Sequence, residues 1–323
     1  MRYYLGIDGG GTKTRFALCD GRGRVVAKQT LPSCHYLQHG LPTLTSTVRT
    51  GLNDVCEQSG ITMADVTYCF ISCGGYGDVA EDCKKIEKAV LDGLGSIQFS
   101  VGNDCENALA GALCGKEGIT LVAGTGSIGA GINSEGIFLR SGGWHYAIGG
   151  DEGSAYWIAS RLLNEWLRQY DGRDKKSALF DYIRAKLGVE TGEELLDLLV
   201  NVWKMDRTII ASIAPIVGIL FDNGDQYAQA ILDDVANNLC EIAIALRKRL
   251  NFSDFTEVSY SGGVFKLGER IIEPLRKKLC KNNLLLVPPV LPPTAGAIIL
   301  AMKADGILID SSIVNSLKAD RLL

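Results

Sequence analysis

The segments YYLGIDGGGTKT (residues 3–14) and GITLVAGTGSIG (residues 118–129) decide the fold of this chain. Each is an apolar run typical of a β-strand, followed by a glycine-rich turn and the start of a second strand. The second segment repeats the first at a constant offset of 115 residues, without a gap. The matching pairs are Gly9 with Gly124, Gly11 with Gly126, Gly21 with Gly136, Thr12 with Ser127, and Asp20 with Glu135. This repeat predicts two related domains that arose by internal duplication.

Strands and helices alternate through the rest of both copies. The first copy predicts helices at 41–59 and 79–94 and strands at 66–72 and 97–101. The second carries a mostly helical insertion at about 154–250, followed by strands at 257–261 and 284–287 and helices at 267–278 and 294–304. Such alternation indicates sheets covered by helices. The predicted fold class is therefore α/β, with two duplicated domains (1–117 and 118–323) and a cleft between them.

The composition is that of a globular protein. Of the 323 residues, 46% are hydrophobic and 22% are charged, which excludes a disordered chain, collagen and a coiled coil. The formal net charge is −4, so the basic surface that nucleic acid or an anionic membrane requires is missing. Prolines interrupt the longest apolar runs, and we expect no membrane span. Met1 leads directly into a strand-like segment without an export leader, which favours a cytoplasmic protein.

Ten cysteines and three histidines offer no recognisable metal site. No Cys-x-x-Cys pair occurs, and in a cytoplasmic protein such thiols are mostly reduced and buried as small apolar side chains. His35 and His39 have helical spacing, but the glutamate of a zinc-protease motif does not follow His35. We therefore expect free thiols and no zinc-protease site.

The two glycine-rich turns are candidate phosphate-binding loops. Gly9, Gly10 and Gly11 lie between two strands, whereas a Rossmann fingerprint or a P-loop leads into a helix. Glycines let the backbone approach a polyphosphate, and the exposed N–H groups form an anion site. Thr12 and Lys13 would add a hydroxyl and a charge. Either turn alone is typical of an ordinary hairpin, but the pair, with Gly124-Thr125-Gly126-Ser127 as the second, predicts that both clamp the phosphates of one ATP.

Three further positions suggest the chemistry of a kinase. Asp8 ends the first strand and is the candidate Mg²⁺ ligand, through water because Mg²⁺ keeps much of its hydration shell. Gly262 and Gly263 form either an ordinary turn or a flat surface for adenine and ribose. Asp104 opens the helix after strand 97–101. It is either a helix cap or a carboxylate that orients a substrate hydroxyl and accepts its proton.

A tryptophan and two carboxylates precede the amphipathic helix predicted at 155–167. Trp144 follows Gly142 and Gly143, and Asp151 and Glu152 lie in the segment GGDEGS at 149–154. Acidic residues at the start of a helix often serve only as partners of the helix dipole. A tryptophan beside carboxylates that accept from hydroxyls also describes a carbohydrate pocket.

These motifs resemble the N-acetylglucosamine kinase branch of the BadF/BadG-type ATPase family, within the actin, Hsp70 and sugar kinase superfamily. The resemblance covers nearly the whole chain. Gly6–Thr14 and Gly124–Ser127 resemble the two phosphate motifs, Asn103-Asp104 the catalytic aspartate motif, and Ser261-Gly262-Gly263 the adenosine motif. The most specific match is Gly143-Trp144 with residues 151–158, which resembles the segment that lines the sugar site of amino-sugar kinases.

The resemblance implies duplicated ribonuclease H-like, or actin-like ATPase, domains. It implies transfer of the γ-phosphoryl group of ATP, with Mg²⁺, to the 6-hydroxyl of a small amino sugar such as N-acetylglucosamine, with Asp104 as the base. The implied ATP-binding residues are Gly9, Gly10, Gly11, Thr12, Lys13, Thr125, Gly126, Ser127, Gly262 and Gly263. The implied sugar-binding residues are Cys34, His35, Tyr36, Asn103, Asp104, Gly124, Thr125, Gly143, Trp144, His145, Asp151 and Ser154. Monomer and homodimer both stay open.

Two departures from the family pattern lie at the sugar. Residues 145–150 are one residue longer than the usual spacing, and Cys34-His35-Tyr36 stands where these kinases carry an Asn-His-Trp-like stretch. A wider pocket would accept N-acetylmuramic acid, which carries an ether-linked lactate at C3. Asp151 would repel the lactate unless a donor or cation stood nearby, and His35, Tyr36 and His145 are the candidates for that group.

Two other functions are compatible with the same fold. An ATPase activator of a 2-hydroxyacyl-CoA dehydratase or a benzoyl-CoA reductase superficially shares the segment 73–77. It would need a cluster-binding cysteine before the second glycine turn, where this chain has Ala123. A sugar sensor that binds without phosphorylating would not need an intact Asp104. The residues therefore favour the kinase.

Overall fold

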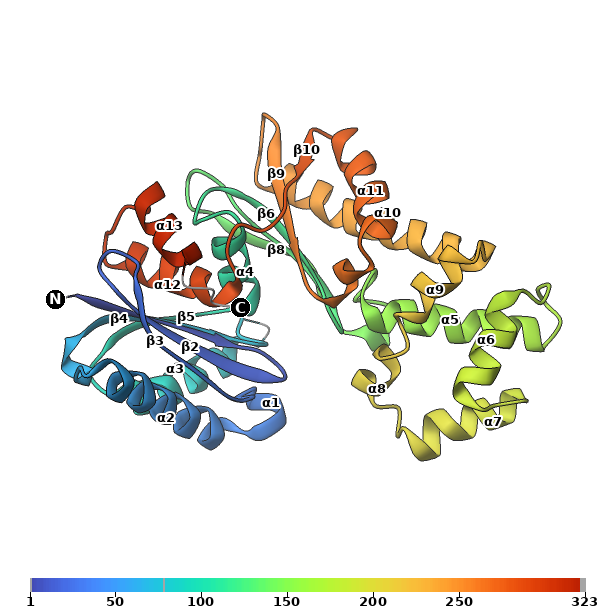
Figure 1. The fold of residues 1–323 in the computed structure, drawn as a ribbon, viewed down its shortest axis with the longest axis horizontal. Coiled ribbons are helices and arrows are strands. Elements are labelled where there is room, and N and C mark those ends of the chain that lie inside the picture. Colours follow the sequence, from blue (N-terminus) through green and yellow to red (C-terminus); the bar gives the residue numbers. More distant parts are fainter. Residues whose placement is uncertain (1, 78, 320–323) are drawn as a thin grey trace. The chain divides into compact units, whose positions relative to one another are not determined.

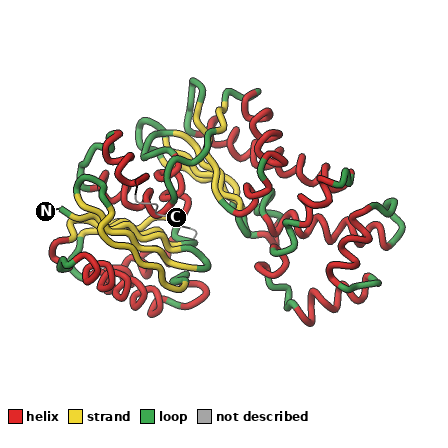
Figure 2. Tube along the Cα trace, in the orientation of Figure 1, coloured by secondary structure: helices red, strands yellow, loops and turns green. Residues whose placement is uncertain are grey.

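The structure, a computed structural model, describes residues 2–77 and 79–319 (Figure 1). The chain divides into two compact units, one made of the residues up to Gly118 with those from Pro288 onward, the other of Ile119–Val287. Each unit contains a five-stranded sheet with helices packed on it (Figure 2). The segment from Pro288 onward thus lies with the first unit, whereas the expected boundaries placed it in the second domain.

The first sheet has the order β3-β2-β1-β4-β5. Its strands are β1 (Tyr3–Gly9), β2 (Lys13–Asp20), β3 (Val25–Pro32), β4 (Val66–Cys73) and β5 (Gln98–Gly102). The hairpin strands β1, β2 and β3 pair antiparallel, whereas β4 pairs in parallel with both β1 and β5. The sheet is therefore mixed, with three parallel strands that end at the same edge.

The second sheet has the order β10-β9-β6-β7-β8. Its strands are β6 (Gly118–Ala123), β7 (Ser127–Ile132), β8 (Phe138–Gly142), β9 (Thr256–Ser261) and β10 (Leu284–Leu286). Here β9 pairs in parallel with β6 and β10, and β7 pairs antiparallel with β8. Read from β8, each strand takes the place of its counterpart in the first sheet, which is the arrangement that the repeat predicts.

Helices cover both faces of the first sheet. They are α1 (Tyr36–His39), α2 (Leu41–Ser59), the 3₁₀ turn η1 (Met63–Asp65), α3 (Ala80–Leu94), α4 (Asp104–Ala112), α12 (Pro293–Ala304) and α13 (Ser311–Ala319). Buried residues of α2 recur every three or four positions (Leu44, Val48, Leu52, Val55), as an amphipathic helix requires. The helices α2 and α3 pack together and bury one face of the sheet, and α12 packs on β1 and β4 at the other.

The close packing of α12 explains why the C-terminal segment belongs to the first unit. A Cβ added at Gly296 would lie 1.9 Å from the carbonyl oxygen of Asn107 in α4, and one added at Gly6 would lie 2.7 Å from the backbone nitrogen of Ile298. Only glycine permits these two contacts. The core on this face includes Tyr4, Ile298 and residues of α13.

The second unit has one continuous core through its sheet and the helical insertion. Its helical segments are η2 (Tyr146–Ile148), α5 (Ala155–Tyr170), α6 (Ala178–Leu187), α7 (Gly192–Asp197), η3 (Leu198–Val202), α8 (Arg207–Ala211), α9 (Ile216–Asp222), α10 (Gln226–Arg249), η4 (Gly263–Leu267) and α11 (Glu269–Cys280). Among the described residues, no single helix has the length and apolar composition to cross a membrane, although one pair, Arg207–Asp222 with Gln226–Arg249, bent by 118°, meets both criteria.

The predicted elements agree closely with the observed ones. The helix predicted at 41–59 has those bounds in α2, and the other predicted helices and strands begin and end within a few residues of the observed elements. The helix predicted at 267–278 is α11, and Gly268, which has a φ of +65°, separates it from the short 3₁₀ helix η4. All ten cysteines are free, as expected, and seven of them are buried.

Candidate active site

Three loops of the first unit lie side by side because β1, β4 and β5 run parallel. Gly9 pairs with Cys73, and Ser72 pairs with Gly102, so the three strands end at one level. The loops that follow them are the glycine turn at 10–12, the loop at 74–77 and the start of α4. Loops at the carboxyl ends of parallel strands are the usual place for a ligand site in α/β proteins.

The first glycine turn is held from below and open at its tip. The N–H of Gly10 donates to the carbonyl of Lys13 (3.1 Å), and the hydroxyl of Ser33 donates to the carbonyl of Gly10 (2.9 Å). A Cβ at Gly9 would lie 2.4 Å from the carbonyl oxygen of Ser72, so a side chain does not fit there. Gly11, Thr12 and Lys13 are exposed. The turn can therefore present backbone donors, a hydroxyl and an ammonium group to an anion.

Asp8 lies beneath this turn in a shell of donors. Its side chain is buried, with one oxygen accepting from Asn107 Nδ2 (2.8 Å) and the other from Arg15 Nη1 (3.3 Å) and Thr294 Oγ1 (3.5 Å). Arg15 is the cross-strand partner of Asp8 in the β1–β2 hairpin. The hairpin register would have identified this pair from the sequence, whereas Asn107 and Thr294 reach Asp8 only through the fold.

The residues around Asp8 fit a hydrated Mg²⁺. The Oδ1 atom of Asn107 is buried and has no hydrogen-bond partner among the described residues, so it is available to a metal-bound water. No group of three or more His, Cys, Asp or Glu side chains in the described ranges could hold a metal ion. Oxygen donors with a single carboxylate suit Mg²⁺, which keeps several waters and shares its ligands with phosphate.

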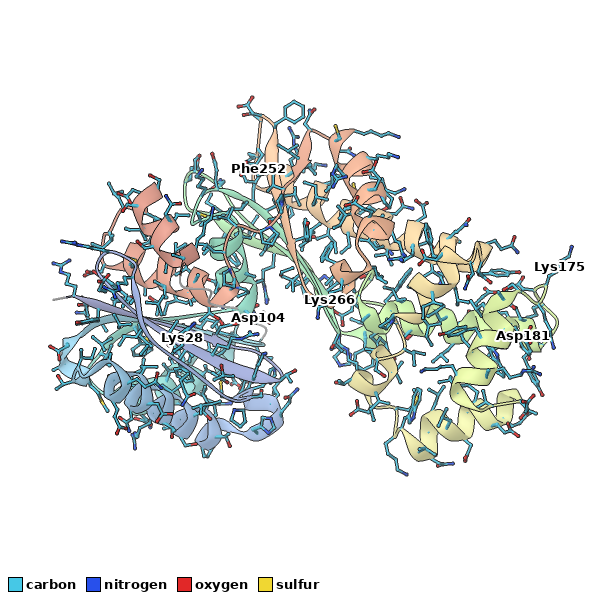
Figure 3. All side chains as sticks on the ribbon, viewed as in Figure 1. Lys28, Asp104, Lys175, Asp181, Phe252 and Lys266 are labelled. Carbon is cyan, nitrogen blue, oxygen red and sulfur yellow. The ribbon has the colours of Figure 1, made fainter. Side chains whose placement is uncertain are left out.

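Asn103 and Asp104 have different roles at the start of α4. The side chain of Asn103 accepts from the N–H of Cys105 (3.2 Å), and the backbone N–H of Asn103 donates to the side chain of Glu106 (2.9 Å), which completes a capping box. Asp104 is the first residue of the helix and is exposed (Figure 3). Asn103 therefore supplies the helix cap, and the cap does not account for the carboxylate of Asp104.

The predicted sugar contacts Cys34, His35 and Tyr36 lie beside the same loops. His35 packs against the loop at 74–77, because a Cβ at Gly74 would lie 2.8 Å from its ring, and it stacks on Tyr36 at 5.9 Å. Asn103, which directly follows β5, also contacts this loop, because its Nδ2 donates to the carbonyl of Tyr76 (2.9 Å). Cys34 is buried, and burial raises the pKa of its thiol. The structure thus groups Cys34–Tyr36 with Asn103.

The second unit has an equivalent edge where β6 and β9 end in parallel. Val122 pairs with Ser261, and a Cβ at Gly262, which has a φ of +107°, would lie 2.3 Å from the carbonyl oxygen of Ala123. Gly263 is exposed, and a Cβ there would meet no atom within 4 Å. Gly262 therefore lets the turn after β9 pack against the end of β6, and Gly263 leaves an open surface beside that contact.

The start of α5 holds the second glycine turn. The N–H of Ala155 donates to the carbonyl of Gly124 (2.8 Å), and the N–H of Tyr156 donates to the carbonyl of Thr125 (3.3 Å). The hydroxyl of Ser127 donates to the carbonyl of Glu152 (2.6 Å). A Cβ at Gly124 would meet no atom within 4 Å, and Thr125 is exposed. The tip of this turn is therefore open, as in the first unit.

Asp151 is buried beneath the second turn, in a left-handed conformation with a φ of +64°. One carboxylate oxygen accepts from the N–H of Ser127 (3.0 Å), and the other forms an ion pair with Arg207 of α8. Burial raises the pKa of Asp151, and the Ser127 N–H and the Arg207 charge only partly oppose that rise. Asp151 therefore fixes the turn and binds an arginine from the helical insertion.

The segment between Gly143 and Asp151 folds back on itself. A Cβ at Gly150 would lie 2.0 Å from the carbonyl oxygen of Trp144, and Trp144 as a residue is 70% exposed. His145 is exposed, and its Nδ1 accepts from the N–H of Ala147 (3.2 Å). Ser154 is fully buried, and its hydroxyl accepts from the N–H of Trp157 (3.1 Å), so it caps α5. Trp144 and His145 are thus accessible to a ligand, whereas Ser154 has a structural role.

The predicted residues form two sets, one in each unit. The first comprises Asp8–Lys13, Cys34–Tyr36, Asn103 and Asp104, and the second comprises Gly124–Ser127, Gly143–His145, Asp151, Ser154, Gly262 and Gly263. Arg207 also belongs to the second set, although it was not predicted from the sequence. It lies 56 residues after Asp151 in a helix that carries none of the motifs, so no local pattern marks it.

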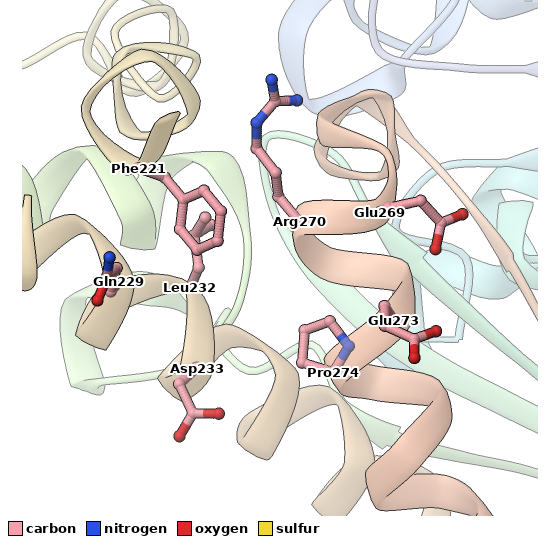
Figure 4. A pocket seen from close by; sticks show the side chains of 8 residues that line it. All are labelled: Phe221, Gln229, Leu232, Asp233, Glu269, Arg270, Glu273 and Pro274. Atoms are coloured by element: carbon pink, nitrogen blue, oxygen red, sulfur yellow. The ribbon is translucent and has the colours of Figure 1, made fainter. Parts of the chain in front are cut away.

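A groove of about 470 Å³ lies between α9 and α10 on one side and α11 on the other (Figure 4). Phe221 and Leu232 line it together with Pro274, and Arg270 at its rim forms an ion pair with Asp222. Gln229, Asp233, Glu269 and Glu273 complete the lining. None of the predicted site residues lines this groove.

Comparisons with known proteins agree with the motifs. The BadF/BadG/BcrA/BcrD ATPase family matches residues 5–301. The N-acetyl-D-glucosamine kinase of Dictyostelium discoideum is 30% identical over 313 residues, which cover 93% of this chain and 98% of that protein. The N-acetylmuramic acid/N-acetylglucosamine kinase of Clostridium acetobutylicum is 30% identical over 291 residues, which cover 87% and 92%.

A solved structure from Chromobacterium violaceum, described as that of a candidate N-acetylglucosamine kinase, has the same fold. It superimposes with a TM-score of 0.73 at 25% identity and covers 93% of this chain and 99% of the other. These findings confirm the α/β fold class and the resemblance that the motifs indicated. The chain belongs to the BadF/BadG/BcrA/BcrD ATPase family.

Proposed function

We propose that this protein is a kinase that transfers the γ-phosphoryl group of ATP to the 6-hydroxyl of an N-acetylated amino sugar. N-acetylglucosamine and N-acetylmuramic acid are the two proposed acceptors, since relatives at 30% identity act on them. One observation carries the proposal. Asn103 is the residue that caps α4, and the next residue, Asp104, is exposed at the carboxyl edge of the first sheet, beside the first glycine turn.

Asp104 is the proposed catalytic base. Its carboxylate orients the 6-hydroxyl and accepts the proton as the oxygen attacks the γ-phosphorus, and the bond to the β-phosphate oxygen breaks. The proton then resides on the carboxyl group, and ADP leaves with the electron pair of the broken bond. An exposed carboxylate at a helix start can accept this proton without disturbing a hydrogen bond of the helix cap.

The glycine turns are the proposed phosphate sites. The tips of the two turns, Gly11-Thr12 and Thr125-Gly126, offer backbone donors together with the hydroxyls of Thr12 and Thr125, and Lys13 adds an ammonium group. Gly262-Gly263 offers the open surface for adenosine. Asp8 and Asn107 would hold a hydrated Mg²⁺, which when bound neutralises charge on the phosphates. Backbone donors that need no rearrangement are well suited to stabilising charge that develops during transfer.

Each unit has accessible residues that are proposed sugar contacts. Trp144 offers a large exposed ring for the face of a sugar, and His35 and Tyr36 lie beside Asn103. Asp151 is buried, and each of its carboxylate oxygens already has a partner in the protein. We therefore propose that its main role is to hold the turn at Ser127. A sugar hydroxyl could donate to the same carboxylate as an additional partner.

A panel of acceptors tests the proposal. ADP release is measured with ATP, Mg²⁺ and, in turn, N-acetylglucosamine, N-acetylmuramic acid, glucosamine, N-acetylmannosamine and glucose. We expect sugar-dependent ADP release with at least one of the two proposed acceptors and much less with glucose, because the contacts to the acetamido group are then not made. ADP release that no sugar stimulates would contradict the proposal.

A further inference from the structure

Arg207 occupies an unusual position for a side chain of the helical insertion. Its Nη2 pairs with Asp151, and its guanidinium carbon lies 5.0 Å from the ring centre of Tyr146 and 5.9 Å from that of Tyr156. The guanidinium group also lies against the second glycine turn, since a Cβ at Gly126 would be 2.5 Å from Nη2. One carboxylate, two aromatic rings and a turn thus fix its position, at about one-third exposure.

The backbone at Arg207 is fixed independently of these contacts. Asp206 caps α8, with its side chain accepting from the N–H groups of Thr208 (2.8 Å) and Ile209 (2.9 Å). The site is therefore prearranged, and a ligand would not have to order the side chain on binding.

Arg207 has more hydrogen-bond donors than Asp151 can use. A guanidinium group has five N–H donors in a fixed plane, and Asp151 engages Nη2 alone. Its Nε is buried, so a ligand would reach the Nη groups of this side chain, which is about one-third exposed. The fork of an arginine matches a carboxylate in two parallel hydrogen bonds. A second carboxylate can therefore bind the same guanidinium group, and the positive charge offsets the repulsion from Asp151.

The aromatic support of Arg207 comes from the segment that departs from the family pattern. Tyr146 lies in residues 145–150, the segment one residue longer than the usual spacing, and its ring also stacks on His145 at 4.4 Å. The proposed sugar contact Trp144 precedes it by two residues. The longer segment thus places an aromatic ring beneath the guanidinium group, next to the proposed sugar contacts of the second unit.

His145 lies in the same segment, and its Nδ1 already accepts from the N–H of Ala147. Arg207 carries a guanidinium group with more donors than its one carboxylate partner uses. Arg207 is therefore better placed than His145 to receive an anion.

We infer that Arg207 is a specificity-determining residue that binds the lactyl carboxylate of N-acetylmuramic acid. This inference rests on the proposed function. Hydrogen bonds to a charged partner make a difference of about 10- to 100-fold in binding. We therefore expect the protein to bind N-acetylmuramic acid about 10- to 100-fold more tightly than its uncharged methyl ester, which has nearly the same shape.

The test compares binding and turnover in Arg207→Gln and Arg207→Lys with the intact protein. The ligands are N-acetylglucosamine, N-acetylmuramic acid and its methyl ester. Calorimetry measures their affinities without ATP, so the result does not depend on turnover. Arg161→Gln is the matched control, because Arg161 also forms an ion pair, with Asp234 (3.2 Å), and lies over a ring, that of Trp157 (5.2 Å).

The inference predicts that Arg207→Gln loses the preference for the acid over the ester and keeps most of its affinity for N-acetylglucosamine. Arg207→Lys should retain part of the preference, and Arg161→Gln should retain all of it. An equal loss for all three ligands would mean that Arg207 acts through Asp151 and the turn, and would overturn the inference. Failure of the intact protein to bind N-acetylmuramic acid, with N-acetylglucosamine phosphorylated, would overturn it and leave the proposed function standing.

Discussion

Asp104 and Asn103 are neighbours with separable roles, and a single substitution distinguishes them. Replacing Asp104 with Asn keeps the shape of the side chain but removes its ability to accept a proton. We expect Asp104→Asn to lower kcat by about 10²- to 10⁴-fold, with little change in sugar affinity or in the midpoint of thermal unfolding. Steady-state kinetics and calorimetry measure these quantities.

The matched control for Asp104 is Glu81, an acidic residue in the first turn of α3. Glu81→Gln should leave kcat unchanged, because a helix dipole partner contributes to stability alone. If Asp104→Asn turned over at the normal rate, Asp104 would be a helix dipole partner as well, and the proposed base would be wrong.

The buried carboxylate of Asp151 predicts a pH dependence of stability. Burial raises its pKa above the ordinary value of 3.8, so the folded state holds the proton at pH values where the unfolded state has lost it. The contribution of Asp151 to stability is therefore full below about pH 4 and declines as pH rises through the raised pKa. Urea unfolding should show the intact protein losing stability relative to Asp151→Asn as the pH rises above about 4. A difference that grows in favour of the intact protein would contradict this.

Single residues also show where sequence reasoning succeeds and fails. The sequence identifies Asp8, Asp104 and Trp144 because each lies in or beside a motif. In the structure, Asp104 and Trp144 are exposed at loops, and Asp8 is buried just beneath one. Ser154 lies in such a motif too, but its hydroxyl is used in capping α5. Arg207 has no motif around it. Its position depends on the packing of the insertion against Asp151, which no local pattern encodes.

At the scale of elements, replacing a glycine in a turn and replacing one where two helices cross should have different effects. A Cβ at Gly124 would meet no atom within 4 Å, whereas one at Gly296 would lie 1.9 Å from the backbone of α4. We expect Gly124→Ala to keep the stability of the fold within about 0.5 kcal/mol and to lower kcat/KM, because the methyl group occupies ligand space. Gly296→Ala should instead destabilise the protein by about 1–3 kcal/mol or more.

The control for this pair is Gly21→Ala, in the turn between β2 and β3. A Cβ at Gly21 would make ordinary contacts, with Arg2 at 3.8 Å, so neither stability nor turnover should change. Thermal unfolding and steady-state kinetics of the three variants provide the comparison. Full activity in Gly124→Ala would show that no ligand approaches this turn.

The order of the elements was predictable because their signals are local. The spacing of apolar residues defines α2, and the paired glycines mark both hairpins. The placement of α12 was not predictable in this way, since it packs on β1 through Gly6 and on α4 through Gly296, residues far apart in the chain. The expected domain boundary at residue 117 followed the repeat along the sequence and therefore assigned this helix to the second copy.

At the scale of the whole molecule, the proposed site residues are divided between the two units. The first holds the proposed base and one glycine turn, and the second holds the other turn, the proposed adenosine surface and Trp144. Each unit has a core of its own, so damage to one site need not unfold the other unit. Loss of activity without loss of structure is therefore the expected result of substitutions at either set of loops.

The most direct test of the central claim is the identity of the product. ATP, Mg²⁺ and N-acetylglucosamine or N-acetylmuramic acid are incubated with the protein, and phosphorus–proton correlation NMR locates the phosphate on the sugar. The account predicts a phosphate on the 6-hydroxyl oxygen of at least one of these sugars, with one ADP formed for each sugar phosphate. Inorganic phosphate without a sugar phosphate, or a phosphate at the anomeric oxygen, would contradict it.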